Sequence, residues 1–387
     1  MLEGRKVTVL GAGVAGLAVA RALALRGAEV TVLEQAPEIR EVGAGLQISP
    51  NGVRVIEALG LGAAFEAGSQ PAEAVELLDG ETGGCVVRLD LGRGRPGAGF
   101  RFVHRADLID LLAEGARDAG VALRLSQRVE AVTLGAHPPR LRVEGREEVG
   151  CDVLVGADGL HSRVRAALNG AVAPFFTGQV AWRATLPETG DLPPVARVYM
   201  GAGRHLVTYP LRGGRLRNIV AVEERSRWAE ESWSLTDDPL TLRVAFERFV
   251  PEVRGWLDRI ERPNLWGLFR HPVAARWQGQ GAAILGDAAH PTLPFLAQGA
   301  NMALEDGWVL ADCLSRAGPD VALAAYQAQR EARVRRIVEA ANANARNYHL
   351  SGLRRDIAHA GLRLAARFVP DAMLGRFDWV YGHDVTA

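Results

Sequence analysis

Two short apolar runs rich in β-branched residues lie at the start of the chain, on either side of a longer run rich in alanine and leucine. The runs Lys6 to Leu10 and Glu29 to Leu33 have the composition of strands. Between them, Val14 to Leu25 has its apolar residues at helical spacing. The start of the chain therefore predicts a strand, a helix and a second strand, the repeating unit of a parallel α/β sheet.

The same patterns continue through the rest of the chain. Between Glu73 and Arg101, short strands alternate with glycine and proline. Helical patterns cover Asp107–Ala119, Leu240–Phe249, Asn301–Arg316 and Val321 to about His349. Strand patterns cover Val121–Leu125, Arg128–Leu134, Val153–Val155, Phe175 to about Val222, Leu265–Phe269 and Ala282–Leu285. We therefore expect a mostly β insertion within a domain of alternating strands and helices.

A glycine-rich loop joins the first strand to the first helix. Gly11 allows a tight turn, Gly13 lets the backbone approach a pyrophosphate, and Gly16 lets the helix pack closely on the sheet. The free N–H groups at the helix start favour phosphates. Glu34 follows the second strand, where an acidic residue binds ribose hydroxyls. The loop predicts a dinucleotide site that includes Ala15 together with these four residues.

A second loop, nearly three hundred residues later, has the form of a segment that holds the sugar-alcohol chain and ring of a flavin. Asp287 lies just beyond an apolar strand, where its carboxylate can accept hydrogen bonds from ribitol hydroxyls. Gly299, Ala300 and Asn301 open a helix, and their free N–H groups can face the anionic edge of a reduced flavin. Two remote segments that share one cofactor predict FAD.

Composition limits the class of protein. The 387 residues include 45 basic and 45 acidic side chains, which gives no overall attraction to nucleic acid or to an anionic membrane. Cys85, Cys151 and Cys313 have no paired or metal-binding spacing, so we expect a reducing cytoplasm and no metal. The glycine loop begins almost at Met1, so we expect no leader ahead of it, and no apolar run is long enough to span a membrane. A monomer or a homodimer is expected.

Three motifs occur in order along the chain: Gly11-x-Gly13-x-x-Gly16, Gly156-Ala-Asp158-Gly159-x-x-Ser162-x-x-Arg165 and Gly286-Asp287-Ala-Ala-His290-Pro291. With these motifs the chain resembles the class A flavoprotein aromatic hydroxylases, which are single-component FAD monooxygenases. Within that family it is most similar to salicylate hydroxylase, 3-hydroxybenzoate 6-hydroxylase and 6-hydroxynicotinate 3-monooxygenase. The resemblance covers nearly all of the chain, to about residue 350.

The resemblance implies an α/β fold. We expect an FAD-binding, Rossmann-type (glutathione-reductase-like) domain, interleaved with a mostly β substrate domain and followed by C-terminal helices. The FAD-binding domain is expected at residues 1–72, 101–174 and 270–350, and the substrate domain at residues 73–100 and 175–269. The C-terminal helical tail is expected at residues 351–387.

The resemblance also implies roles in cofactor binding and a reaction. Arg105 matches a family arginine that contacts the cofactor, and Asp158-Gly159 matches a motif tied to both FAD and the pyridine nucleotide. Without the resemblance, Arg105 is as well explained as an exposed arginine at a helix start, and Asp-Gly as a turn. In the implied reaction, NAD(P)H, with NADH favoured, reduces the FAD. Oxygen then adds at C4a, and the hydroperoxyflavin hydroxylates a small aromatic substrate.

A histidine and a tyrosine in the β insertion are the candidate catalytic residues. His205 and Tyr209 are four residues apart, so a strand places both on one face, about 13 Å apart along it. They resemble the histidine and tyrosine pair of the hydroxybenzoate and hydroxynicotinate enzymes. A histidine near neutral pKa can accept a phenol proton, which makes the ring richer in electrons. A structural role for a lone strand histidine is the alternative.

Four further residues are candidates for substrate binding. Gln47 falls in a segment that is a pocket loop in the family, where some members carry histidine. Arg183 can pair with a substrate carboxylate, although a solvated arginine on a sheet is an equal alternative. Pro294 and Phe295 precede the turn at the flavin edge, so their apolar surfaces can pack on the substrate ring. Together these residues predict a pocket for a small, planar phenol or hydroxy-heteroaromatic that carries a carboxylate.

Other classes of protein explain less of the sequence. An NAD dehydrogenase explains the first glycine loop but not the later two motifs. A flavin halogenase requires a Trp-x-Trp-x-Ile-Pro motif and a catalytic lysine, whereas this chain has no such motif and its only lysine is Lys6. The alternatives that remain are an FAD monooxygenase acting on a substrate other than an aromatic acid or on a larger polycyclic one, a flavoprotein oxidoreductase that does not hydroxylate, and a flavin-binding protein without catalysis.

Overall fold

The structure, a computed structural model, describes residues 2–39, 45–92, 99–135, 138–190, 192–226, 236–369 and 375–387. Its helices are α1 (Val14–Ala24), α2 (Pro50–Ala58), α3 (Gly62–Gly68), α4 (Arg105–Asp118), α5 (Arg163–Asn169), α6 (Pro239–Ala245), α7 (Pro251–Asp258), α8 (Gly299–Arg316), α9 (Pro319–Tyr348), α10 (Gly352–Phe368) and α12 (Asp378–Tyr381), with 3-10 turns η1 (Gly286–Ala288) and η2 (Pro294–Leu296).

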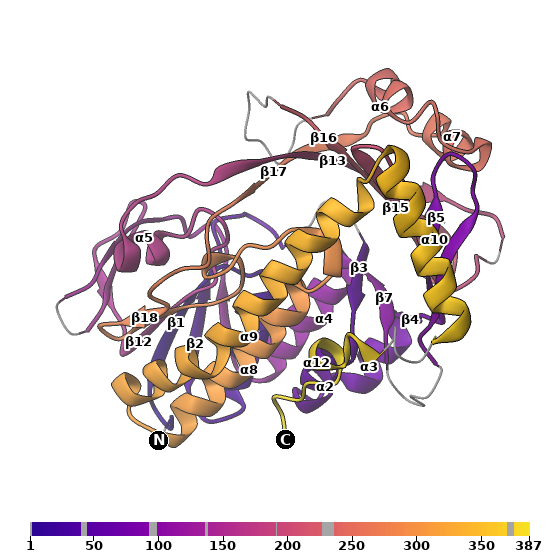
Figure 1. Ribbon diagram of the computed structural model, residues 1–387. Helices are drawn as coiled ribbons and strands as arrows, with labels where there is room; N and C mark the ends of the chain where they lie inside the picture. Colours follow the sequence, from indigo (N-terminus) through magenta and orange to yellow (C-terminus); the bar gives the residue numbers. More distant parts are fainter. Residues whose placement is uncertain are drawn as a thin grey trace.

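Within the described residues, the strands form four sheets. They are β1 (Lys6–Leu10), β2 (Glu29–Leu33), β3 (Gly45–Ile48), β4 (Gln70–Pro71), β5 (Ala74–Asp79), β6 (Cys85–Asp90), β7 (Arg101–His104), β8 (Ala122–Arg124), β9 (Val129–Thr133), β10 (Arg140–Val143), β11 (Val149–Gly150), β12 (Val153–Gly156), β13 (Phe175–Pro187), β14 (Val195–Gly201), β15 (Arg204–Leu211), β16 (Leu216–Glu224), β17 (Asn264–Arg270), β18 (Gln278–Gly279) and β19 (Ala282–Ile284). The expected α/β fold is confirmed, with a six-stranded and a seven-stranded sheet as its main layers (Figure 1).

A six-stranded sheet carries all three sequence motifs on one edge. Its order is β18-β19-β12-β1-β2-β8, and β19, β12, β1, β2 and β8 pair in parallel. The carboxyl ends of parallel strands lie on the same edge of a sheet. The loops that follow β1, β12 and β19, which are the three motifs, are therefore neighbours, with Glu34 at the end of β2 beside them. Helices α1 and α8 pack closely on each other beside this sheet, since a Cβ on Gly307 of α8 would lie 3.1 Å from the backbone nitrogen of Val19 of α1.

The seven-stranded sheet has two different faces. Its order is β17-β13-β16-β15-β14-β5-β6, and its strands come from residues 74–90 and 175–270. One face packs on α6 and α7 through a core that includes Trp182, Leu206 and Trp256. The side chains between these along each strand point to the opposite face. On that face, Val222 packs in one cluster with Phe295 of the η2 turn. The second face is thus turned toward the cofactor half of the chain.

Long helices connect the two halves of the molecule. Figure 1 shows α9 running from the six-stranded sheet to the seven-stranded one, with α10 along the outer edge beside β5. The C-terminal turn α12 is held against α2 and α9, because Arg333 donates to the carbonyls of Trp379 and Val380, and Arg54 to that of Tyr381. None of the helices in the described ranges is long and apolar enough to cross a membrane.

Two expectations about local structure were wrong. The helix expected over Leu240–Phe249 is shorter, because α6 ends at Ala245, and a separate helix, α7, starts beyond the expected range at Pro251, a residue suited to a first helical turn. Gln47 lies in strand β3, paired with Phe102 of β7, rather than in a loop. The domain boundaries stay a prediction.

Candidate active site

The first glycine loop has the shape that a bound pyrophosphate needs. Gly11 has a φ of +97°, and a Cβ on it would lie 2.5 Å from the carbonyl oxygen of Ala157. A Cβ on Gly16 would lie 1.9 Å from the carbonyl oxygen of Gly11, so α1 approaches the loop as closely as backbone permits. A Cβ on Gly13 would meet no atom within 4 Å. The loop therefore leaves open space at Gly13 beside the start of α1.

Glu34 lies beside this loop. Its carboxylate accepts hydrogen bonds from the backbone amides of Ala12 and Ala36, each at 2.8 Å. These bonds fix the side chain at the carboxyl end of β2, next to the amino end of α1. The geometry suits a carboxylate that also accepts from ribose hydroxyls.

An arginine from the second motif joins that motif to the third. Arg165 donates to the carbonyl oxygens of Ala288, Ala289 and Pro272, at 3.0, 3.1 and 2.7 Å. Asp158 accepts from the Ser162 hydroxyl at 2.5 Å and from the amide of residue 163, so it caps the start of α5. Burial raises the pKa of Asp158, although these donors oppose the shift. The Arg165 contacts explain physically why the arginine belongs to the motif.

Asp287 lies in the η1 turn just after β19 and is exposed to solvent. Its crowded surroundings raise the pKa of Asp287, and the nearby His290 and Arg105 oppose this shift. Arg105 is the first residue of α4 and so approaches Asp287 from another element. An exposed carboxylate near an arginine suits a polar cofactor chain.

The start of α8 forms the next wall. Because α8 begins at Gly299, its first amides have no acceptor in the preceding helical turn. The Asn301 side chain is fully buried; it accepts from the amide of Ser49 and donates to the carbonyls of Gln47 and Ala297. The side chain of Asn301 thus joins β3 to the start of α8. A contact of Asn301 with a flavin is therefore expected from its backbone amide and not from its side chain. Ala297 has a φ of +52°, which turns the chain into the helix.

A hydrogen-bonded chain of three side chains leads from the interior to solvent. His205 on β15 is 1% exposed, and its Nδ1 lies 2.7 Å from Nε2 of His349, just after α9. Nδ1 of His349 lies 2.7 Å from a carboxylate oxygen of Glu224, whose side chain is 53% exposed. Sequence analysis missed His349 and Glu224, because neither is near His205 along the chain.

The exposed carboxylate sets the proton positions along this chain. A carboxylate only accepts, so His349 donates from Nδ1 to Glu224 and its Nε2 is the acceptor. His205 then donates from Nδ1, which leaves a lone pair on its Nε2. Burial and the neighbouring His349 hold the pKa of His205 well below its ordinary value, so this ring is neutral at pH 7. Burial also lowers the pKa of His349, with Arg204 acting in the same direction and Glu224 against it.

His205 is packed among aromatic rings. Its ring centroid lies 5.2 Å from that of Phe295 on η2 and 5.3 Å from that of Tyr348. Burial raises the pKa of Tyr348 to about 12, so its hydroxyl stays protonated. Pro294, next to Phe295, is exposed. The structure therefore brings His205 and Phe295 into contact, whereas Pro294 faces solvent.

Tyr209 lies further along the same face of β15. Its ring stacks on Phe102 at a centroid distance of 5.0 Å, and a Cβ on Gly45 would lie 2.8 Å from its hydroxyl oxygen. Asn218, which is fully buried, accepts from the amide of Gly45 at 2.7 Å. Among the described residues no partner lies within bonding distance of the Asn218 amide nitrogen. Burial raises the pKa of Tyr209, although Arg183 opposes the shift, so both phenol and amide are hydrogen-bond donors here.

The strand register shows on which face of the sheet Arg183 lies. Arg183 pairs with Val220, and Val220 pairs with Val207, which lies between His205 and Tyr209 on β15. Directly paired residues share a face, so Arg183 is on the face that carries both candidate catalytic residues. Its guanidinium stacks on Trp266 at 4.3 Å. Arg183 is therefore a cation on the face of the sheet turned toward the cofactor half.

A buried network of charges supports the third motif from behind. Asp306 contacts Nε2 of His290 at 2.5 Å and Nε of Arg330 at 2.8 Å. Glu305 contacts Arg330 at 2.6 Å and Arg333 at 2.7 Å. The side chains of Glu305, Asp306 and Arg330 are at most 1% exposed. This network connects the third motif, through His290, to α8 and α9. The sequence pattern did not predict it.

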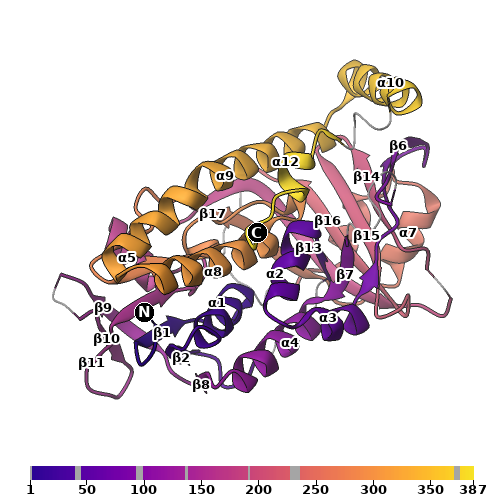
Figure 2. The ribbon, with the colours of Figure 1, turned by 90° about the horizontal axis from the view of Figure 1, so that it is seen from below.

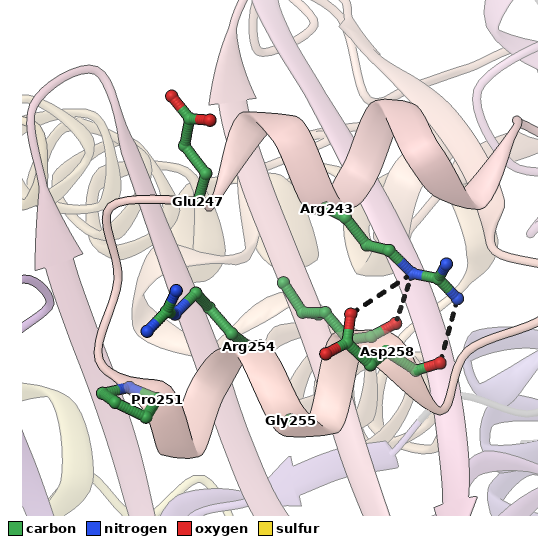
Figure 3. A pocket seen from close by; sticks show the side chains of 7 residues that line it. Arg243, Glu247, Pro251, Arg254, Gly255 and Asp258 are labelled. Carbon is green, nitrogen blue, oxygen red and sulfur yellow. Dashed lines mark hydrogen bonds and ion pairs between the residues drawn. The ribbon is translucent and has the colours of Figure 1, made fainter.

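A surface hollow lies elsewhere on the molecule. It measures about 370 Å³ and lies between α6 and α7, where Arg243 is bound to Asp258 (Figure 3). These helices cover the face of the seven-stranded sheet opposite His205. Its exposed, charged lining does not suit an aromatic ring, and we assign it no function. Across the described residues no cluster of metal-binding side chains occurs.

Comparisons with known proteins agree with this geometry. A family model described as an FAD binding domain matches residues 5–341. The chain is 34% identical to 3-amino-4-hydroxybenzoate 2-monooxygenase PtmB3 from Streptomyces platensis, over 98% of this chain and 96% of the relative. It is 35% identical to 3-hydroxybenzoate 6-hydroxylase from Polaromonas naphthalenivorans (strain CJ2), again over 98% and 96%. Among solved structures, Klebsiella pneumoniae HpxO complexed with FAD and uric acid has a TM-score of 0.84 and 25% identity, covering 97% of each chain.

Proposed function

The chain belongs to the class A flavoprotein aromatic hydroxylases, which are FAD-dependent monooxygenases, and from this membership we propose that it hydroxylates a small, planar phenol or hydroxy-heteroaromatic that carries a carboxylate. The observation that carries the proposal is the hydrogen-bonded chain from buried His205 through His349 to exposed Glu224. Hydroxylation of a phenol is easier after the phenol loses its proton. A neutral histidine with an exit path for that proton supports this chemistry.

In the proposed reaction, this chain's residues handle the proton. Nε2 of His205 accepts the proton of the substrate hydroxyl, and Nδ1 of His205 passes its own proton to Nε2 of His349. His349 in turn passes a proton from Nδ1 to Glu224, which exchanges it with solvent. The net result is one proton moved from the substrate to water. The relay spares His205 from holding a charge in a buried, apolar site.

The remaining residues bind and orient. Arg183 is proposed to pair with the substrate carboxylate and Asn218 to donate to a substrate oxygen, while Tyr209 donates beside it. Gln47, Pro294 and Phe295 are proposed to line the ring, which excludes water from the reacting carbon. Phe295 does so from the position where it already packs on His205.

The cofactor groups fit the residues present. The open space at Gly13, the fixed carboxylate of Glu34 and the exposed carboxylate of Asp287 suit the pyrophosphate, ribose and ribitol of FAD. Bound FAD supplies the redox chemistry and the activation of oxygen. NADH as donor, the route of oxygen transfer implied by the resemblance and a cytoplasmic location are further parts of the proposal.

The test of the proposed function is product formation. Purified, FAD-loaded protein is mixed with NADH and a panel of hydroxybenzoates and hydroxynicotinates, and hydroxylated product is quantified separately from NADH loss. We expect product from at least one carboxylated ring, in amounts that approach NADH consumed. NADH oxidation that gives only hydrogen peroxide with every member of the panel contradicts the proposal.

The proton relay gives a prediction with a matched control. Glu224→Gln and His349→Gln are expected to lower the rate of hydroxylation roughly 100-fold or more, within the range typical of general-base catalysis, while FAD affinity is unchanged. His205→Ala is expected to do the same and to increase the share of NADH lost to hydrogen peroxide. Glu223→Gln is the control, because the neighbouring Glu223 binds Arg204 and Arg225 instead of the relay.

The readout is the pH profile of the hydroxylation rate together with product yield per NADH. If the relay acts, the relay variants regain rate as the pH rises, because hydroxide and the more ionised substrate replace the lost base. A uniform loss of activity at all pH values, shared by Glu223→Gln, would return these residues to a structural role. A high KM with unchanged kcat would do the same.

A further inference from the structure

The C-terminal helix α10 carries an exposed apolar stripe. Leu353, Ile357, Leu364 and Phe368 are 75%, 63%, 61% and 68% exposed. At 3.6 residues per turn, these four side chains fall within an arc of about 60°. They therefore form one continuous stripe along nearly the full length of α10, instead of isolated surface residues.

The opposite side of α10 is firmly packed, so the direction of the stripe is fixed. Leu362 packs with Val86 and Met200 of the seven-stranded sheet. His359 lies 3.5 Å from the carboxylate of Asp79. Figure 2 shows α10 at the edge of the molecule, where another molecule has access to it.

The stripe is symmetric about the Ala360–Gly361 bond. Ile357 and Leu364 lie three residues outside this pair on either side, and Leu353 and Phe368 lie seven outside it. We propose that α10 pairs antiparallel with α10 of a second copy of this chain, across a two-fold axis at Ala360–Gly361. A two-fold interface must be self-complementary, and the symmetric spacing of these four side chains meets that condition.

The register of that pairing matches large side chains to one another. Leu353 faces Phe368 of the second copy, and Ile357 faces its Leu364, so each of the four apolar positions is covered. At the crossing point both helices present small residues, and a Cβ on Gly361 would meet nothing within 4 Å. Small residues at a crossing let two backbones approach closely.

The charges beside the stripe are complementary in the same register. Asp356 and Arg367 lie on the same flank of the stripe, and the Asp356 side chain is 62% exposed. The two-fold axis brings Asp356 to within about 3 Å along the axis of Arg367 of the second copy, and the reverse pair forms by symmetry. A parallel arrangement lacks this match. The charges therefore favour the antiparallel pair.

The size of the interface predicts how tight the dimer is. A helix of 17 residues is about 25 Å long, so a single helix pair buries less than the roughly 800 Å² per partner of a standard interface. We therefore expect a dimer that dissociates on dilution.

Analytical ultracentrifugation of the full-length, FAD-loaded protein over a range of concentrations tests the proposal. The wild type is expected to shift from monomer to dimer with rising concentration. Leu364→Glu is expected to remain monomeric, while Leu240→Glu, an equally exposed leucine on α6, behaves as the wild type. FAD content reports that each variant is folded. A wild type that stays monomeric, or a dimer that Leu364→Glu does not weaken, overturns the proposal.

Cysteine cross-linking tests the register. In a Cys85→Ser background, which removes the exposed native thiol, Gly361→Cys is expected to form a disulfide-linked dimer on mild oxidation. Arg354→Cys is the matched control, because the axis places two copies of position 354 about 20 Å apart. Equal cross-linking of both variants contradicts the antiparallel register. Binding of the arginine-rich α10 to anionic vesicles by a strictly monomeric protein would assign the stripe to a membrane instead.

Discussion

Gly16→Ala is expected to weaken FAD binding strongly. The added Cβ would lie 1.9 Å from the carbonyl oxygen of Gly11 and 3.0 Å from its carbonyl carbon, which are backbone atoms that cannot move aside. Overpacking costs about 1–3 kcal/mol, and each 1.4 kcal/mol is tenfold in affinity, so we expect FAD affinity to fall by roughly 100-fold. Titration of the apoprotein with FAD, followed by flavin fluorescence, measures this change.

Gly13→Val distinguishes damage to the folded loop from loss of the space that the cofactor occupies. Gly13 has a φ of −79° and no neighbour within 4 Å of a Cβ, so valine should leave the melting temperature of the apoprotein unchanged. FAD affinity should still fall, because the side chain occupies the space through which the pyrophosphate approaches. Undiminished FAD binding by Gly13→Val would place the pyrophosphate elsewhere.

The second large effect is on stability. Arg330→Met removes the cation that the buried carboxylates of Glu305 and Asp306 share, and removing one partner of a buried ion pair costs about 3–5 kcal/mol. Arg335→Met on the same helix is the control, since its ion pair with Glu331 is on the surface and worth roughly 0.5 kcal/mol. Urea unfolding of the two variants should differ by several kcal/mol. Similar unfolding midpoints would mean that water or a rearranged side chain compensates for the lost guanidinium.

The same network predicts sensitivity to acid. Although burial alone raises it, His290 and Arg330 hold the pKa of Asp306 at about 2, below its ordinary value of 3.8. A carboxyl whose folded pKa is lowered stabilises the protein above its unfolded pKa. That contribution is therefore complete above about pH 4 and is lost as the pH falls toward 2. The free energy of unfolding of Asp306→Asn, measured by urea unfolding at several pH values, should accordingly depend less on pH in this window than that of the wild type.

The cofactor half of the site could be predicted from the sequence because its signals are local. The strand, glycine loop and helix around Gly11 are contiguous, and each glycine is required by its own backbone geometry. The order of the motifs then predicted the family, which the comparisons confirm. The alternation of strand residues likewise placed His205 and Tyr209 on one face, since that follows from the strand itself.

Tertiary structure alone decided what surrounds those residues. His205 meets His349, 144 residues later, because the end of α9 passes beside β15. No periodicity in either element encodes that contact, and the exposed Glu224 joins it only through the pairing of β15 with β16. The same is true of Arg330, a charged residue that sequence patterns place at the surface. It is buried because two carboxylates from α8 balance its charge there, and that balance exists only once the helices pack.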